Sequence, residues 1–182
     1  MYFEKPGKVN TRKTLELAYQ RGQELGLNEV VVASSKGETA FLALEIFSNF
    51  KITVVTYHSG FKEPFKTVMP DEVKSKLRDL GAEVVSATHA LSGVERSLFN
   101  KYKGGFPVLV IADTLRLFGQ GVKVAVEISI MAADAGTLTG KDIISVGGTA
   151  RGADGALVLK PTNQSDLFAM RIREIVCKPA NF

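Results

Sequence analysis

Residues 30–56, VVVASSKGETAFLALEIFSNFKITVVT, decide the fold of this chain. Val30–Ala33 and Ile52–Thr56 are short apolar runs, which are typical of buried strands. Between them, Glu38–Phe50 carries apolar residues on one side at helical spacing. A strand, a helix and a second strand in this order predict two parallel strands joined through a covering helix.

The same alternation of elements continues on both sides of this unit. We expect further helices at residues 11–26, 70–81 and 92–101, and further strands at residues 83–86, 143–146, 156–159 and 170–177. No repeat, low-complexity segment or linker interrupts the pattern. The sequence therefore predicts one α/β domain over residues 1–182, with a parallel sheet covered by helices on both faces.

The segment 106–136 fits two interpretations. Val108–Ile111 has the composition of a buried strand, and Val122–Ile130 alternates as a strand does. However, the second stretch continues into an alanine-rich tail that ends at Gly136, which is typical of a helix terminus. We therefore expect two helices separated at Gly119–Gly121, the second apolar nearly all round and deeply buried.

The composition limits the classes of protein to which the chain can belong. Its single cysteine, Cys177, excludes an internal disulfide and is expected to be a buried, inert thiol. Met1–Pro6 contains no apolar segment, and the apolar run Phe106–Ala112 is too short to cross a bilayer. These features predict a cytoplasmic protein with no membrane partner.

Charge and metal-ligand spacing exclude two further classes. The net charge is +4, but the basic residues are scattered and mixed with acidic ones, so we expect no nucleic-acid partner. One cysteine and two histidines that are distant in sequence do not make a zinc pattern, so we expect no metal site.

Residue types suited to ligand chemistry collect after the expected strands. In open α/β sheets, ligands bind outside the carboxyl ends of the strands. The four loops expected at that edge are Ser34–Thr39, Tyr57–Gly60, Ala87–Ala90 and Gly147–Asp154, and both histidines, His58 and His89, lie within them. Their glycines and small polar residues predict a site for a phosphorylated small molecule.

The loop Ser34–Thr39 opens a helix, where free backbone N–H groups and the helix dipole attract an anion. Gly37 would allow close approach of a phosphate, and the hydroxyls of Ser35 and Thr39 are further donors. A second interpretation is that Ser35 and Glu38 form a capping box and bind nothing.

The loop Gly147–Asp154 is the other candidate for the phosphate. It contains Gly147, Gly148 and Gly152, with Arg151 among them. Glycines permit close approach, and an arginine can donate two hydrogen bonds to a phosphate. An ordinary glycine-rich connection with a solvated arginine has the same composition, so the sequence leaves open which loop holds the phosphate.

Longer motifs resemble a known family. Ser34–Ala40 resembles the phosphate loop of the pyruvate kinase C-terminal domain, while Thr88–Arg96, Thr114–Val124 and Gly147–Asp154 resemble stand-alone, mostly archaeal proteins of that fold. The resemblance covers nearly the whole chain. It implies a three-layer α/β/α sandwich with a mainly parallel sheet, and it favours the helical interpretation of residues 107–136.

The resemblance also implies a cofactor. Proteins of the stand-alone group are similar in carrying flavin mononucleotide (FMN), which implies that this chain binds it and is a redox flavoprotein; the reaction is open. The catalytic machinery of pyruvate kinase belongs to a TIM barrel, for which 182 residues leave no room, so we expect no pyruvate kinase activity.

These expectations define a set of candidate residues. The candidates for cofactor binding are Ser34, Ser35, Lys36, Gly37, Glu38, Thr39, His58, Ser59, Gly60, Thr88, His89, Phe118, Gly119, Gln120, Gly147, Gly148, Thr149, Arg151 and Gly152. Phe61 and Phe118 are candidates for an apolar wall against the flavin ring.

Two alternatives to a flavoprotein remain open. One is a non-catalytic sensor of a phosphorylated metabolite. The other is a hydrolase or lyase that acts on a phosphorylated small molecule, with His58 or His89 as the acid/base. Whether the chain is an enzyme, and whether it forms a homo-oligomer, is open at this point.

Overall fold

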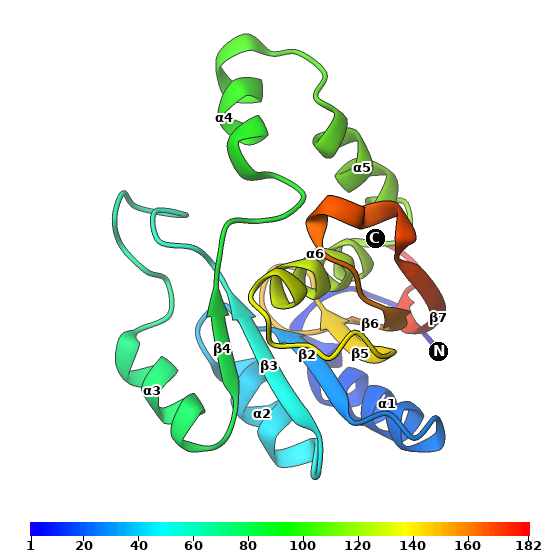
Figure 1. Ribbon diagram of the computed structural model, residues 1–182. Helices are drawn as coiled ribbons and strands as arrows, with labels where there is room; N and C mark the ends of the chain where they lie inside the picture. The colour runs from blue at the N-terminus through cyan, green and yellow to red at the C-terminus, as the bar shows by residue number, and fades with distance from the viewer.

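The computed structural model describes all residues 1–182, and its centre is one seven-stranded sheet (Figure 1). The strands are β1 (Tyr2–Phe3), β2 (Glu29–Ala33), β3 (Lys51–Thr56), β4 (Glu83–Ser86), β5 (Ile143–Gly147), β6 (Gly155–Lys160) and β7 (Arg171–Pro179). Their order across the sheet is β1-β7-β6-β5-β2-β3-β4. The strand order places the first unit of the sequence, β2 and β3, beside β5.

The sheet is mainly parallel, as expected. β5, β2, β3 and β4 pair in parallel, while β6 pairs antiparallel with both β5 and β7. The reversal at β6 has a simple cause. β5 ends at Gly147 and β6 begins at Gly155, and this connection is shorter than the dozen or more residues that a parallel crossover needs.

Helices cover both faces of the sheet. They are α1 (Thr11–Glu24), α2 (Glu38–Ile46), α3 (Asp71–Asp79), α4 (Gly93–Tyr102), α5 (Pro107–Arg116) and α6 (Gln120–Asp134), with short 3₁₀ turns η1 (Lys8–Asn10) and η2 (Gln164–Ala169). Figure 1 shows α1, α2 and α3 on one side of the sheet, with α5 and α6 on the other. The architecture is therefore the three-layer α/β/α sandwich that the resemblance implied.

The core follows from the alternation of side chains along each strand. In β2, Val30 and Val32 pack with the layer of α1 to α3, while Val31 packs with the layer of α6. All three are fully buried. A strand that is apolar on both faces is what a sheet covered on both sides requires.

The helical interpretation of residues 106–136 is confirmed. α6 is buried along almost its whole length, whereas α4 has no buried residue and lies farthest from the sheet in Figure 1. None of the helices is both long and apolar enough to span a membrane.

Two elements differ from the expectation. α2 ends at Ile46 rather than Phe50, because Phe47 and Phe50 turn to pack edge-on against each other and against Tyr19 of α1. The two-residue strand β1, which pairs with β7, was not predicted because so short a segment has no periodicity.

Candidate functional site

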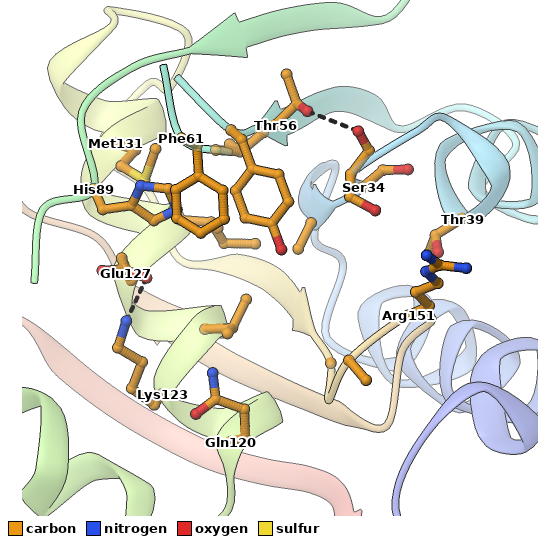
Figure 2. Close-up of a pocket in the computed structure, with 18 of the residues that line it drawn as sticks. Ser34, Thr39, Thr56, Phe61, His89, Gln120, Lys123, Glu127, Met131 and Arg151 are labelled. Carbon is orange, nitrogen blue, oxygen red and sulfur yellow. Dashed lines mark hydrogen bonds and ion pairs between the residues drawn. The ribbon is translucent and has the colours of Figure 1, made fainter. Parts of the chain in front are cut away.

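The carboxyl ends of β2, β3, β4 and β5 border one pocket of about 620 Å³ (Figure 2). Its lining comes from the start of α2, the ends of β2 and β3, the segment after β4, the helices α4, α5 and α6, and the loop between β5 and β6. This volume lies in the usual range of about 300–1,000 Å³ for small-molecule sites. The pocket lies at the edge of the sheet at which the sequence led us to expect a ligand.

The first wall of the pocket is the loop before α2. The buried Ser34 hydroxyl accepts hydrogen bonds from the backbone N–H groups of Gly37 (3.2 Å) and Ala40 (3.3 Å). The second interpretation of this loop, a capping box of Ser35 and Glu38, is therefore wrong, since Ser34 accepts these bonds. The N–H groups that donate to no atom of the chain are those of Ser35, Lys36, Glu38 and Thr39, all of which line the pocket.

Gly37 shapes this loop from the side away from the pocket. Its φ of +105° lies in the region that favours glycine, and a Cβ there would lie 2.6 Å from Cγ1 of Val73 in α3. Gly37 does not line the pocket. Its role in the structure is to let the chain turn tightly between β2 and α2, at the point where Val73 of α3 packs against the loop.

Glu38 lines the pocket but does not present a free carboxylate to it. Its Oε2 accepts a hydrogen bond from Nζ of Lys8, and this bond lowers the pKa of the Glu38 carboxyl, with a smaller contribution from Arg151 and Lys36. The repulsion that a carboxylate would exert on a phosphate is therefore offset by three nearby cations.

The second wall is the glycine-rich loop between β5 and β6. A Cβ at Gly148 would overlap the Gly152 carbonyl oxygen, and one at Gly152 would lie 2.7 Å from Cα of Lys8, so both positions require glycine. This packing holds the loop against the N-terminal segment, where Thr11 Oγ1 accepts a hydrogen bond from the Ala153 N–H. Arg151 makes no ion pair within the chain, and both Arg151 and Thr39 line the pocket.

The opposite end of the pocket carries an aromatic wall, formed by Tyr57, Phe61 and His89. The rings of Tyr57 and Phe61 are stacked with centroids 4.0 Å apart, and the His89 ring lies 5.0 Å from Phe61 at a tilt of 30°. His58 does not line the pocket, but its ring packs edge-on against His89 at 5.4 Å. The wall offers a flat, partly apolar surface.

A buried ion pair lies beside this wall. Lys123 and Glu127 of α6 pair through Nζ and Oε2, with side chains only 6% and 4% exposed. Glu127 Oε1 also accepts the Leu91 N–H at 3.1 Å, which ties α6 to the segment after β4. Burial lowers the pKa of Lys123, and the charge and hydrogen bond of Glu127 oppose that shift.

His89 is the titratable group of the wall. Partial burial lowers its pKa below the ordinary 6.5, the charge of Glu127 opposes the shift, and Lys123 and His58 add to it. A histidine with a lowered pKa is neutral near pH 7, so it can accept a proton at one ring nitrogen and donate from the other.

Three glycines bring α6 close to the sheet. A Cβ at Gly147 would lie 2.2 Å from the Gly121 carbonyl oxygen, and one at Gly155 would lie 2.9 Å from the Gly121 carbonyl carbon. The start of α6 therefore packs backbone against backbone on the ends of β5 and β6. This contact positions Gln120 and Lys123 at the pocket.

The structure brings together about half of the candidate residues. Those that line the pocket are Ser34, Ser35, Lys36, Glu38, Thr39, His89, Gln120, Gly148, Arg151 and Gly152. Those that do not line it are Gly37, His58, Ser59, Gly60, Thr88, Phe118, Gly119, Gly147 and Thr149. Of the two proposed wall residues, Phe61 lines the pocket and Phe118 does not.

Several charged residues of the pocket were missed in the sequence. These residues belong to helices rather than to the loops after the strands, where ligand-binding residues were expected; they are Arg96, Arg116, Lys123 and Glu127. The one available indication was a lysine and a glutamate spaced i,i+4 within an otherwise apolar helix.

Cys177 lies in β7, away from the pocket, and is fully buried. Burial raises the pKa of its thiol to about 11. The thiol is therefore protonated near neutral pH, in line with the expected inert role.

Comparison with known proteins gives two findings. The family model described as pyruvate kinase, alpha/beta domain, matches residues 12–159, which is most of the chain. Among solved structures, the chain is similar to the pyruvate kinase of Cryptosporidium parvum in complex with ADP, with 16% identity and a TM-score of 0.42. That match covers 93% of this chain and 24% of the other, so the chain spans about a quarter of that pyruvate kinase.

Proposed function

The chain belongs to the family of pyruvate kinase alpha/beta domains, and from that premise we propose that it binds a phosphorylated small ligand, FMN, at the carboxyl edge of the sheet. The observation that carries the proposal is that one pocket joins an anion-binding end to an aromatic wall. At one end are the free N–H groups before α2, with Arg151; at the other are Tyr57, Phe61 and His89.

The anion-binding end suits a phosphate. Free N–H groups at a helix start, together with the helix dipole, stabilise negative charge, and α2 has nine residues to supply that dipole. Arg151 and Lys36 add two positive charges within the same lining. Both loops considered in the sequence border this end, so we propose that they hold one phosphate jointly.

The opposite end suits a planar ring. The lining also includes apolar side chains, among them Val55, Val124 and Ile128. A flavin ring needs a flat apolar surface and a few polar contacts at its edge. When bound, the flavin would supply electron transfer, while the chain would bind and orient it and exclude water from one face.

Two finer points belong to the same proposal. We place the chain with the stand-alone, mostly archaeal proteins that its motifs resemble, and in the cytoplasm. We propose no pyruvate kinase activity, since the fold has one open sheet and no TIM barrel. A coupled assay that detects ATP formation from phosphoenolpyruvate by the pure chain would contradict this.

A lyase or hydrolase of a phosphorylated small molecule is the second candidate. It is favoured by the place of His89 in the pocket, with a lowered pKa, beside the carboxylate of Glu127. This function needs no flavin. A non-catalytic sensor of a phosphorylated metabolite would need neither a flavin nor His89.

The test is a titration of the stripped protein with FMN and with riboflavin. FMN should bind more tightly by at least about tenfold, because each lost charge-assisted hydrogen bond to the phosphate costs about 1.5–3 kcal/mol. Protein purified without added ligand should also absorb in the flavin bands. Colourless protein that binds neither compound would contradict the FMN proposal. The lyase or hydrolase and the non-catalytic sensor would then be the remaining candidate functions.

Variants of Arg151 test whether this residue binds the phosphate of FMN. Arg151→Lys should weaken FMN binding while leaving riboflavin binding unchanged, because lysine lacks the planar fork that engages two phosphate oxygens. Lys13→Ala is the control, since Lys13 is an exposed base on α1 outside the pocket. If Arg151→Ala binds FMN as well as the wild type does, Arg151 is only a surface charge.

A further inference from the structure

Beyond the phosphate end, a second set of cations lines the pocket. Arg96 of α4, Arg116 of α5 and Lys123 of α6 all belong to its lining, although they come from three different helices. In this cationic group, Arg96 and Arg116 act electrostatically on Lys123, whereas Lys36 and Arg151 act on Glu38 at the start of α2, so the two sets of cations have different neighbours. α4 contacts α5, and α5 contacts α6, so three consecutive helices direct like charges to one pocket. The mutual repulsion of these charges favours an anionic ligand between them.

Acidic residues of the chain compensate the cationic group only in part. Lys123 is paired with Glu127, and Arg116 pairs with Asp113, whose side chain is 74% exposed. Arg96 has no carboxylate within ion-pair distance. Arg116 and Arg96 both contribute to lowering the pKa of Lys123, which is a sign of mutual repulsion.

The neighbours of the cationic group favour an ordered binding site. Nε of Arg116 donates to Oε1 of Gln120 at 2.9 Å, which fixes the guanidinium at the pocket and leaves the Gln120 amide nitrogen as a donor. His89 lies on the same wall, next to the Lys123–Glu127 pair. Since Nε and Nη1 of Arg116 are bound to Gln120 and Asp113, its Nη2 remains as a donor, together with the Arg96 guanidinium and the Gln120 amide nitrogen. These donors suit the two oxygens of a carboxylate.

We propose that Arg96, Arg116 and Lys123 form a second anion subsite, which holds the carboxylate of a small substrate beside the aromatic wall. This inference deepens the proposed function, because it names the substrate class that would meet the bound flavin. His89 is then placed to exchange a proton with that substrate. The subsite itself does not depend on which ligand occupies the phosphate end.

The test uses benzoate, a planar carboxylate, and its uncharged analogue benzamide. Calorimetric titration of the stripped chain and of the FMN-loaded chain should show benzoate binding and much weaker benzamide binding. Arg96→Gln and Arg116→Gln should each weaken benzoate binding about tenfold or more. Lys101→Gln is the matched control, because Lys101 is an exposed cation of α4 that does not line the pocket.

Measuring the binding of FMN and of benzoate to the same two variants distinguishes the two anion sites. Arg151→Ala should weaken FMN binding but not benzoate binding to the stripped chain, while Arg96→Gln should do the reverse. If Arg151→Ala abolishes benzoate binding and Arg96→Gln does not, carboxylates bind at the phosphate end and the subsite is overturned. If FMN does not bind but benzoate still depends on Arg96, the subsite stands and the flavin proposal fails.

Discussion

At the scale of single residues, Ser34 organises the start of α2. Its hydroxyl lies under the loop and accepts two backbone N–H groups, whereas the hydroxyl of Ser35 has no partner in the chain. The two serines are adjacent and identical, so the interpretation that sequence spacing offered, with Ser35 as the cap, named the wrong one. Only the direction of the side chain at the end of β2 distinguishes them.

The first prediction compares these two serines. Ser34→Ala should lower the free energy of unfolding by about 1–2 kcal/mol, because it leaves the buried N–H groups of Gly37 and Ala40 without an acceptor. Ser35→Ala should change it by less than about 0.5 kcal/mol. Urea denaturation of the two variants measures the difference. A larger loss for Ser35→Ala would contradict the hydrogen-bond assignment.

His89 should make stability depend on pH. Burial lowers its pKa in the folded chain below 6.5, so the unfolded chain binds more protons there as the pH falls. Stability should therefore decrease as the pH falls below about 6.5. His89→Asn should lose less stability than the wild type between pH 7 and pH 5. Denaturation curves at several pH values measure this, and parallel profiles would show that His89 titrates as it does in the unfolded chain.

At the scale of elements, α6 links the fold to the pocket. Most residues of α6 are buried in the core, and Lys123 and Glu127 of the same helix line the pocket. The sequence predicted the helix from its alanine-rich end, because a continuous helical segment outweighs a period-two pattern of nine residues. It did not predict the ion pair at the site, since that depends on how the helix is rotated against the sheet.

The close approach of α6 to β5 provides the third prediction. A Cβ at Gly147 would lie 2.2 Å from the Gly121 carbonyl oxygen and 2.6 Å from the Ala125 nitrogen, both backbone atoms. Gly147→Ala should therefore destabilise the protein by about 1–3 kcal/mol, a typical cost of overpacking. It should also weaken ligand binding, because α6 must move.

Gly105→Ala is the control for this change. No atom lies within 4 Å of a Cβ at Gly105, so this variant should be neutral or slightly stabilising. Thermal denaturation compares the two. Equal midpoints would mean that α6 is not packed on the end of β5 in solution.

At the scale of the whole molecule, the sequence predicted the layers but not the directions of all strands. Buried strands with two apolar faces require helices on both sides, which fixes the sandwich. The antiparallel direction of β6 depends on the short connection from Gly147 to Gly155, whose sequence indicates only a glycine-rich loop. The contribution of α4, α5 and α6 to the pocket likewise depends on tertiary packing, which local periodicity does not encode.

The last prediction concerns the arm formed by α4, which reaches away from the three layers (Figure 1). It has no buried residue, and Val94 and Tyr102 are 75% and 63% exposed. With so little apolar burial, α4 should open locally at a low free energy. In hydrogen exchange of the ligand-free chain, its amides should therefore exchange far faster than those of α6, which is buried along its length.

A bound ligand should reduce this difference in exchange rate, because Arg96 of α4 lines the pocket. A bound carboxylate that contacts Arg96 stabilises only the closed arrangement, and by mass action it suppresses opening. Saturating benzoate should therefore slow exchange in α4 more than in α3, which does not line the pocket. Arg96→Gln should abolish the slowing in α4. Equal protection of α4 and α6 without ligand would contradict the marginal stability of the arm, and unchanged exchange with benzoate would remove α4 from the binding site.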